Sequence, residues 1–309
     1  MNFNVRYIEY KNFGKCLAVD NGHIELYIML DFGPRIIRFA RANSDENANM
    51  FFENGDRTVF HNDAKMDSAY GENSNWYIYG GHRLWISPEY SPETYYPDND
   101  PVQHFISDSN VIRLVPPVQR VNNLQFEIEI EFTADDDVKL THKCTNCGDA
   151  VKNFSLWALS VMAPQTYEIL PMPSNDMEFL WNRRMMLWPY TDMGDSRVHW
   201  GKKYIGLQQD PNAVCPFKIG INYTGVVYAF NHGNMFVKRT TVYENAVYPD
   251  CNVAFETYTN SNFLELETLS PLFDAAPNNT VAHTEHWSLK GNIALPDIKN
   301  EPLLDKFFS

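Results

Sequence analysis

The segment at residues 80–89 collects side chains that can bind a small polar molecule. Its sequence, Gly-Gly-His-Arg-Leu-Trp-Ile-Ser-Pro-Glu, contains the imidazole of His82, the guanidinium of Arg83, the indole of Trp85 and the carboxylate of Glu89. Sugar hydroxyls need planar hydrogen-bonding groups beside an aromatic face, and this segment offers both. The same residues also fit a structural ion pair between Arg83 and Glu89, with Trp85 in the core.

A second candidate is the pair Glu265 and Glu267, which lie two positions apart in the alternating stretch at residues 262–271. Successive side chains of a strand point to opposite faces, so these two carboxylates point to the same face. Such a pair is also typical of the solvated face of an antiparallel sheet. Because the two lie side by side on one strand, they do not form the opposed pair that glycoside hydrolysis requires.

Further charged side chains occur in less regular surroundings. Residues 183–197, which include Asp192 and Arg197, could form a loop over the mouth of a pocket or a packed lid. Lys218 stands between two apolar residues and could face inward or outward. Lys238 is interpreted as an ordinary outward-facing lysine on an edge strand.

The cysteines and histidines do not form a recognisable metal motif. Cys144 and Cys147 make a single CxxC pair, and His142 alone does not complete a zinc site. His283 and His286 are expected on opposite faces of one strand, so they cannot be joint ligands. There is no HExxH, P-loop, GxGxxG or GxSxG motif, and phosphoryl and hydride transfer therefore lack support. We expect neither a metal nor a cofactor.

Composition limits the possible partners and location. The chain has 309 residues, of which 44% are hydrophobic, and a formal net charge of −14. The negative charge repels polyanions, so nucleic acid is not an expected partner. The N-terminal residues have no apolar run of signal-peptide length, and no later segment approaches a membrane span. An odd number of cysteines, five, argues against a disulfide framework, so we expect a cytoplasmic protein.

Strict alternation of apolar and polar residues predicts the elements that must position these side chains. Residues 125–132 show it best, and with residues 138–144 and 154–162 they predict a meander of three strands. The other predicted strands are three hairpins and a last strand, at residues 24–30 with 36–40, 225–230 with 235–240, 253–258 with 263–268, and 283–289. Strands without long amphipathic helices predict one all-β domain over residues 1–309, built as an antiparallel sandwich.

Two long segments, residues 56–100 and 171–203, lack this periodicity and are rich in Asn, Asp, Pro, Tyr and Trp. Long ordered loops in a compact domain are usually functional. We therefore interpret both segments as candidate functional loops.

Five short motifs, taken in order, resemble the galactose mutarotase-like superfamily, and specifically its uncharacterised aldose 1-epimerase-like branch. They are Gly-Pro-Arg-Ile-Ile at residues 33–37, Gly-Gly-His-Arg-Leu-Trp at 80–85, Thr-Asn-Cys-Gly at 145–148 before the strand of Trp157, Phe-Leu-Glu-Leu-Glu at 263–267 and His-Trp-Ser-Leu at 286–289. The resemblance implies an antiparallel β-supersandwich with a sugar cleft on one concave sheet.

The resemblance also implies roles for particular residues. The catalytic base of the family matches Glu267, with Glu265 as the fallback, and its binding arginine matches Arg83. A histidine of the family protonates the ring oxygen of the sugar, but Trp157 occupies its place in this chain. An indole cannot act as a general acid, so His82 is the substitute candidate.

Two functions remain open at this point. The first is an aldose 1-epimerase-like isomerase, with Glu267 as base and His82 as acid. The second is a non-catalytic carbohydrate-binding or sensing protein, which the loss of the histidine favours. In both, the expected partner is a small carbohydrate, and the residues expected to bind it are Arg83, Trp85, Glu89, Trp157, Asp192, Arg197, Lys218 and Glu265. The identity of the sugar, its phosphorylation and the oligomeric state stay open.

Overall fold

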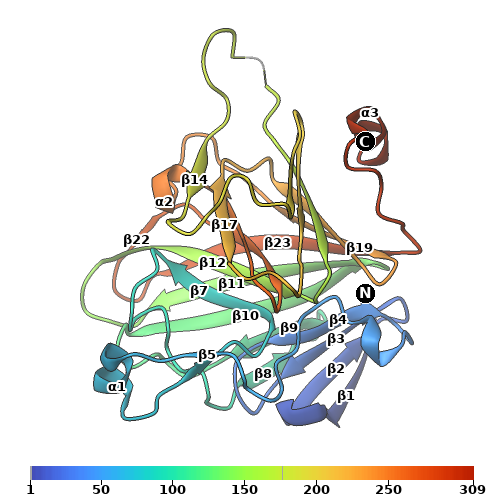
Figure 1. Ribbon diagram of the computed structural model, residues 1–309. Coiled ribbons are helices and arrows are strands. Elements are labelled where there is room, and N and C mark those ends of the chain that lie inside the picture. Colours follow the sequence, from blue (N-terminus) through green and yellow to red (C-terminus); the bar gives the residue numbers. More distant parts are fainter. Residues whose placement is uncertain (1, 176) are drawn as a thin grey trace.

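The structure is a computed structural model that describes residues 2–175 and 177–309. Two large antiparallel sheets face each other and form a sandwich (Figure 1). The predicted all-β class is therefore confirmed. None of the helices in the described part of the chain is long and apolar enough to cross a membrane.

The first large sheet carries the candidate site, and we call it the site sheet. Its strands, in spatial order, are β1 (Asn4–Glu9), β2 (Lys15–Asp20), β3 (Ile24–Met29), β4 (Ile36–Arg41), β7 (Gly81–Ser87), β12 (Lys152–Met162), β21 (Leu264–Leu269), β20 (Phe255–Thr259), β17 (Phe217–Ile221) and β14 (Met185–Leu187), while β22 (Phe273–Ala275) pairs with β12 beside this path.

The second large sheet is called the back sheet. Its strands, in spatial order, are β15 (Val198–Trp200), β16 (Tyr204–Gln208), β13 (Tyr167–Pro171), β18 (Val226–Asn231), β19 (Asn234–Thr240), β23 (Thr280–Gly291), β11 (Asp137–Asn146), β10 (Leu124–Ala134), β9 (Val111–Val115) and β8 (Gln103–Ile106).

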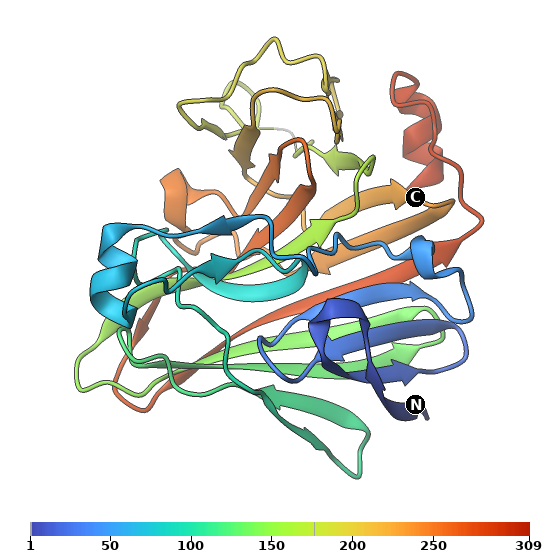
Figure 2. The same cartoon turned by 60° about the horizontal axis from the view of Figure 1, so that its bottom comes forward.

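The remaining elements are short. They are the two-stranded sheet of β5 (Phe60–His61) and β6 (Trp76–Tyr77), the helices α1 (Ala64–Tyr70), α2 (Pro249–Asn252) and α3 (Glu301–Phe307), and the 3-10 helices η1 (Lys11–Phe13) and η2 (Glu46–Ala48). Figure 2 shows α1 at one end of the sandwich and α3 standing away from the sheets near the C-terminus.

The predicted hairpins form as expected, because their turns and alternation are local signals. β3 pairs with β4, β18 with β19 and β20 with β21. β10 shows regular alternation of buried and half-buried residues and pairs with β11.

The predicted three-strand meander is wrong. After β11 the chain leaves the back sheet, and β12 pairs with β7 and β21 in the site sheet. Nine consecutive residues of β12 are buried, as expected of a central strand covered on both faces, so no polar alternation ties it to β11.

Apolar side chains fill the space between the sheets. Phe39, Phe51, Phe236 and Trp287 form an aromatic cluster there, with ring centroids 5.3 to 6.1 Å apart. Fully burying one such side chain stabilises a fold by roughly 1.5–3 kcal/mol. This rigid layer holds the site sheet from behind.

The two segments without periodicity pack over the outer face of the site sheet. In the first, Trp76 and Tyr95 pack against Trp85 of β7, with ring centroids 4.6 and 5.0 Å from its ring. In the second, β14 extends the edge of the sheet beside β17 and leads to Trp188 and Tyr190. Both segments therefore lie beside the same part of the outer face of the site sheet.

Candidate functional site

A cavity of about 310 Å³ lies on the outer face of the site sheet, within the roughly 300–1,000 Å³ range of small-molecule sites. Side chains from β7, β12, β17 and β21 form its floor, and both loop segments contribute to its walls. It brings together seven of the residues selected from the sequence: Arg83, Trp85, Glu89, Trp157, Lys218, Glu265 and Glu267. We call it the central pocket.

Strand register explains why these residues meet. Trp157 of β12 lies opposite Trp85 of β7, and Leu159 lies between Arg83 on one side and Glu267 on the other. Residues in register point to the same face of a sheet, so β7, β12 and β21 present one continuous row of side chains. Glu265 and Glu267 share the outer face, as their spacing predicted.

The carboxylate of Glu267 is fully buried, and its two oxygens have different surroundings. Oε2 accepts hydrogen bonds from the indole Nε1 of Trp157 at 2.9 Å and from Nζ of Lys218 at 3.2 Å. Oε1 has no hydrogen-bond partner among the described residues. A buried oxygen without a partner costs stability, so Oε1 is the unsatisfied acceptor of this carboxylate.

The pKa of Glu267 is raised to about 7. Burial is the largest cause, because it disfavours the charged form, and the nearby Glu265 adds to it. The ammonium of Lys218 acts in the opposite direction and lowers the pKa. A carboxylate with a pKa near neutrality is suited to accept a proton and return it.

Lys218 is buried between two carboxylates and two aromatic rings. Its Nζ lies 2.7 Å from Oε2 of Glu256, and the ring centroids of Trp157 and Trp188 are each 4.6 Å away. Burial lowers the pKa of Lys218, but the charges of Glu267 and Glu256 outweigh it and raise the pKa above its usual range. Lys218 therefore stays protonated at neutral pH.

Arg83 forms the opposite wall of the central pocket. Its Nη1 donates to Oε1 of Glu265 at 2.9 Å, and its guanidinium stacks on Trp85 and Trp76 at 4.3 and 5.0 Å from the ring centroids. The sequence suggested an ion pair with Glu89, but Glu89 is exposed at the rim and accepts a hydrogen bond from a tyrosine hydroxyl.

The structure does not bring His82 into the central pocket, which corrects its assignment as the acid. His82 precedes Arg83 on β7, so its side chain points to the opposite face, between the two sheets. There it is fully buried, with Nδ1 2.9 Å from Ser160 Oγ and Nε2 2.7 Å from Nε2 of His142. Burial is the main cause that lowers the pKa of His82 well below its usual value.

Asp192 and Arg197 also lie outside the central pocket, against expectation. Asp192 is exposed and caps a turn by accepting from the backbone N–H of Gly194 at 2.8 Å. Arg197 pairs with Asp195 at 2.7 Å and donates to the backbone carbonyl of Cys215 at 2.9 Å. Asp192 therefore stabilises its own turn, and Arg197 ties the loop to the segment that contains Cys215.

Lys238 is not the outward-facing lysine that the sequence indicated. It is fully buried between the sheets, and its Nζ lies 2.9 Å from Oε1 of Glu285. His82, His142 and Glu285 are close enough together to hold a metal ion. However, hydrogen bonds and this ion pair already occupy the polar atoms of the three, and the adjacent ammonium repels a cation.

Several residues in and around the central pocket were not predicted from the sequence. Trp76, Tyr95, Tyr190 and Tyr258 line it, and Glu256 supports it from the next strand. Glu256 lies directly opposite Glu267 in the pairing of β20 with β21, so correct strand pairing would have found it. The aromatic residues from the loops carry no periodic signal.

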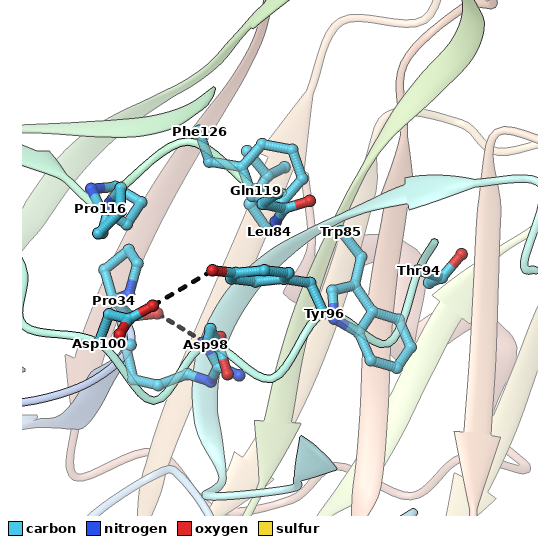
Figure 3. Close-up of a pocket in the computed structure, with 13 residues that line it drawn as sticks. Pro34, Leu84, Trp85, Thr94, Tyr96, Asp98, Asp100, Pro116, Gln119 and Phe126 are labelled. Atoms are coloured by element: carbon cyan, nitrogen blue, oxygen red, sulfur yellow. Dashed lines mark hydrogen bonds and ion pairs between the residues drawn. The ribbon is translucent and has the colours of Figure 1, made fainter. Parts of the chain in front are cut away.

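A second, smaller cavity lies near Trp85 but does not compete as a site. Figure 3 shows it between Pro34, Tyr96, Asp98 and Gln119, where the hydroxyl of Tyr96 points toward Asp100. Its volume is about 20 Å³, which is room for a water molecule but not for a sugar. This small cavity is therefore no alternative to the central pocket for a sugar-sized ligand.

An antiparallel sandwich with a polar and aromatic pocket on its outer face is the class of protein that fold and site define. No protein-family model matches the chain, and no curated protein sequence matches it. Several solved structures are similar to the chain in fold. A galactose mutarotase-like protein from Lactobacillus casei superposes with a TM-score of 0.57 at 6% identity, over 89% of this chain and 99% of that one.

Two further structures are similar over most of this chain. A putative mutarotase, YeaD, from Salmonella typhimurium gives a TM-score of 0.52 at 7% identity and 94% coverage of each chain. A TPR-domain containing protein from Parabacteroides distasonis gives 0.56 at 11% identity, over 91% of this chain and 48% of that one, so this chain spans about half its length. The chain therefore has the galactose mutarotase-like fold.

Proposed function

We propose that this protein binds a sugar in the central pocket and interconverts its anomers, as an aldose 1-epimerase-like isomerase. The observation that carries the proposal is the Glu267 carboxylate, which has a pKa of about 7 and one unpartnered oxygen in a pocket walled by aromatic rings. Aromatic faces and charged hydrogen-bonding groups are the surroundings that sugar rings and hydroxyls require. The odd cysteine count keeps the cytoplasm as the proposed location.

In this proposal, Oε1 of Glu267 accepts the proton of the anomeric hydroxyl. The bond between the anomeric carbon and the ring oxygen then breaks, the open-chain aldehyde rotates, and ring closure gives the other anomer. General-base catalysis of this kind contributes about 10²–10⁴-fold. Arg83 and Glu265 hold sugar hydroxyls through their paired charges, Trp85 supplies a ring face, and Glu89 acts at the rim.

The second candidate is a non-catalytic carbohydrate-binding or sensing protein. One observation favours it: the indole of Trp157 occupies the position where the resemblance leads us to expect a proton-donating histidine. Its N–H is engaged with Glu267, and an indole does not transfer protons at neutral pH.

The test measures anomeric equilibration of freshly dissolved α-glucose, α-galactose and their 6-phosphates by polarimetry or proton NMR. We expect the wild-type protein to accelerate equilibration for at least one sugar, and Glu267→Gln to lose about 10²–10⁴-fold of that rate. Glu244→Gln, at an exposed position, is the matched control and keeps the wild-type rate.

Calorimetric titration with the same sugars separates the two candidates. Saturable binding without any acceleration would favour the non-catalytic protein. No binding of any of these sugars would contradict both candidates.

A further inference from the structure

Opening a pyranose ring moves two protons, and the proposed base accounts for only one of them. A proton leaves the anomeric hydroxyl, and another must reach the ring oxygen as its bond to the anomeric carbon breaks. Both oxygens are bonded to the same carbon. The proton donor must therefore lie directly beside the base, which restricts the search to groups that contact Glu267.

Several polar groups of the central pocket cannot supply this proton. Arg83 keeps its proton at every accessible pH, and the indole of Trp157 is a donor that does not release its proton. Tyr95 already donates to Glu89 at the rim. His61, on β5, has a side chain 41% exposed and lies within 3.3 Å of a neighbouring aspartate, Asp63.

Lys218 does meet the requirement. Its Nζ is 3.2 Å from Oε2 of Glu267, so the ammonium contacts the carboxylate whose other oxygen, Oε1, is the proposed base. An ammonium group has three N–H donors, and the contacts with Glu267 and Glu256 engage two of them. The third N–H is left for a ligand in the central pocket, which Lys218 lines.

We propose that Lys218 is the general acid of the anomerisation and replaces the histidine that the resemblance leads one to expect. This inference rests on the proposed function. Oε1 of Glu267 takes the proton of the anomeric hydroxyl, the carbonyl forms as the ring bond breaks, and the ring oxygen takes a proton from Nζ of Lys218. Ring closure reverses every transfer, so atoms and charges balance.

The surroundings of Lys218 keep its acid form present, and they hold its proton less strongly once Glu267 has become neutral. Glu267 and Glu256, with Glu89 further away, keep the ammonium charged, so the acid form is present before reaction. An alkoxide binds a proton more strongly than an amine does, and the ring oxygen therefore takes the proton once its bond breaks. The protonated Glu267 and the neutral amine then stay side by side until ring closure reverses both transfers.

Two aromatic rings fix the direction of the ammonium. Trp157 and Trp188 lie on Lys218 at equal centroid distances of 4.6 Å, and attraction between the cation and both rings holds Nζ between them. Trp157 also holds Oε2 of Glu267. The residue that replaced the expected histidine thus positions both the base and the proposed acid.

The experiment compares Lys218→Met and Lys218→Arg with the wild-type protein in the anomerisation and calorimetric assays. We expect Lys218→Met to lower kcat by about 10²–10⁴-fold while sugar binding persists. Lys218→Arg keeps the charge but cannot release a proton, so we expect it to stay slow. Lys299→Met, at an exposed position outside the central pocket, is the control expected to keep the wild-type rate.

Lys218→Met leaves the carboxylate of Glu256 buried without its cation and so threatens folding. The double variant Lys218→Met with Glu256→Gln removes this buried charge, and circular dichroism verifies that it folds. Wild-type rates in either methionine variant, or in Lys218→Arg, would overturn the role of Lys218 and leave sugar binding intact. Binding by the wild type without acceleration would also overturn it. Absence of binding would instead contradict the proposed function itself.

Discussion

At the scale of single residues, the central pocket depends on how one carboxylate divides its contacts. Oε2 of Glu267 accepts from Trp157 and Lys218, and Oε1 accepts from no described residue. Donors on one oxygen fix the plane of the carboxylate and stabilise its charge, which leaves the other oxygen as its unsatisfied acceptor. The carboxylate is thus oriented by its neighbours in the absence of any ligand.

Trp157→Phe tests this arrangement. Removing a hydrogen bond to the charged form destabilises that form, so the pKa of Glu267 is expected to rise above its value of about 7. A hydrogen bond to a charged group contributes about 1.5–3 kcal/mol, which corresponds to roughly one to two pH units. The measurement is a ¹³C NMR titration of the glutamate carboxyl, combined with the pH dependence of kcat/KM.

Trp188→Phe is the matched control, because Trp188 lies on Lys218 and no described hydrogen bond joins it to Glu267. Its titration midpoint is expected to stay within about half a pH unit of the wild type. A Trp157→Phe midpoint equal to that of the wild type would show that the indole does not stabilise the charged carboxylate.

Parity along a strand decided which of the predicted side chains line the central pocket. Glu265 and Glu267 are two positions apart and do share the pocket face. His82 and Arg83 are adjacent, so the same rule already excludes both from one face, and only Arg83 lines the pocket. Asp192 and Arg197 lie in a loop, where no periodicity states the direction of a side chain.

At the scale of elements, a buried lysine joins the two sheets behind the pocket. Nζ of Lys238 on β19 donates to the backbone carbonyl of Ala158 on β12 at 3.0 Å and to that of Leu266 on β21 at 2.9 Å. It also pairs with Glu285 on β23. The two strands that carry Trp157 and Glu267 are therefore held from their reverse side by one ammonium.

Lys238→Met is expected to lower the free energy of unfolding by about 3–5 kcal/mol, because it leaves Glu285 buried without its cation. Lys238→Met combined with Glu285→Gln removes the orphaned charge and should recover part of the loss. Chemical denaturation followed by tryptophan fluorescence measures both. Lys290→Met, at an exposed position on β23, should change stability by less than about 0.5 kcal/mol.

Local signals predicted hairpins well but not the pairing between distant strands. The hairpins β3–β4, β18–β19 and β20–β21 follow from alternation on either side of a short turn. β12 was assigned to the wrong sheet because its buried run carries no mark of its partners. Lys238 was misplaced for the same reason: its buried partners come from strands far away in the sequence.

At the scale of the whole molecule, stability depends on pH through groups that folding buries. Burial raises the pKa of Glu168 on β13 to about 8, and the hydrogen bond from Thr257 only partly opposes this. Burial lowers the pKa of His142 and of His283 to about 3. Glu168 therefore lowers the stability of the fold as the pH rises, and the two histidines lower it as the pH falls.

Stability falls with a change of pH wherever that change favours the protonation state of the unfolded chain. Between pH 4.5 and about 8 the folded protein keeps a proton on Glu168 that the unfolded chain has released, so raising the pH through this window lowers stability. Between pH 6.5 and about 3 the unfolded chain binds protons on His142 and His283 that the folded protein does not bind, so lowering the pH there lowers stability.

Glu168→Gln isolates the first effect, because the histidines are the same in both proteins. The amide keeps a similar shape and does not ionise, so the stability of the variant relative to the wild type is expected to increase from pH 4.5 to 8, by roughly 3–5 kcal/mol in total. Urea denaturation at intervals of one pH unit measures this difference, and Glu244→Gln should give a difference that does not vary with pH. A flat difference for Glu168→Gln would mean that its carboxyl ionises as freely in the folded protein as in the unfolded chain, and that water reaches the layer between the sheets.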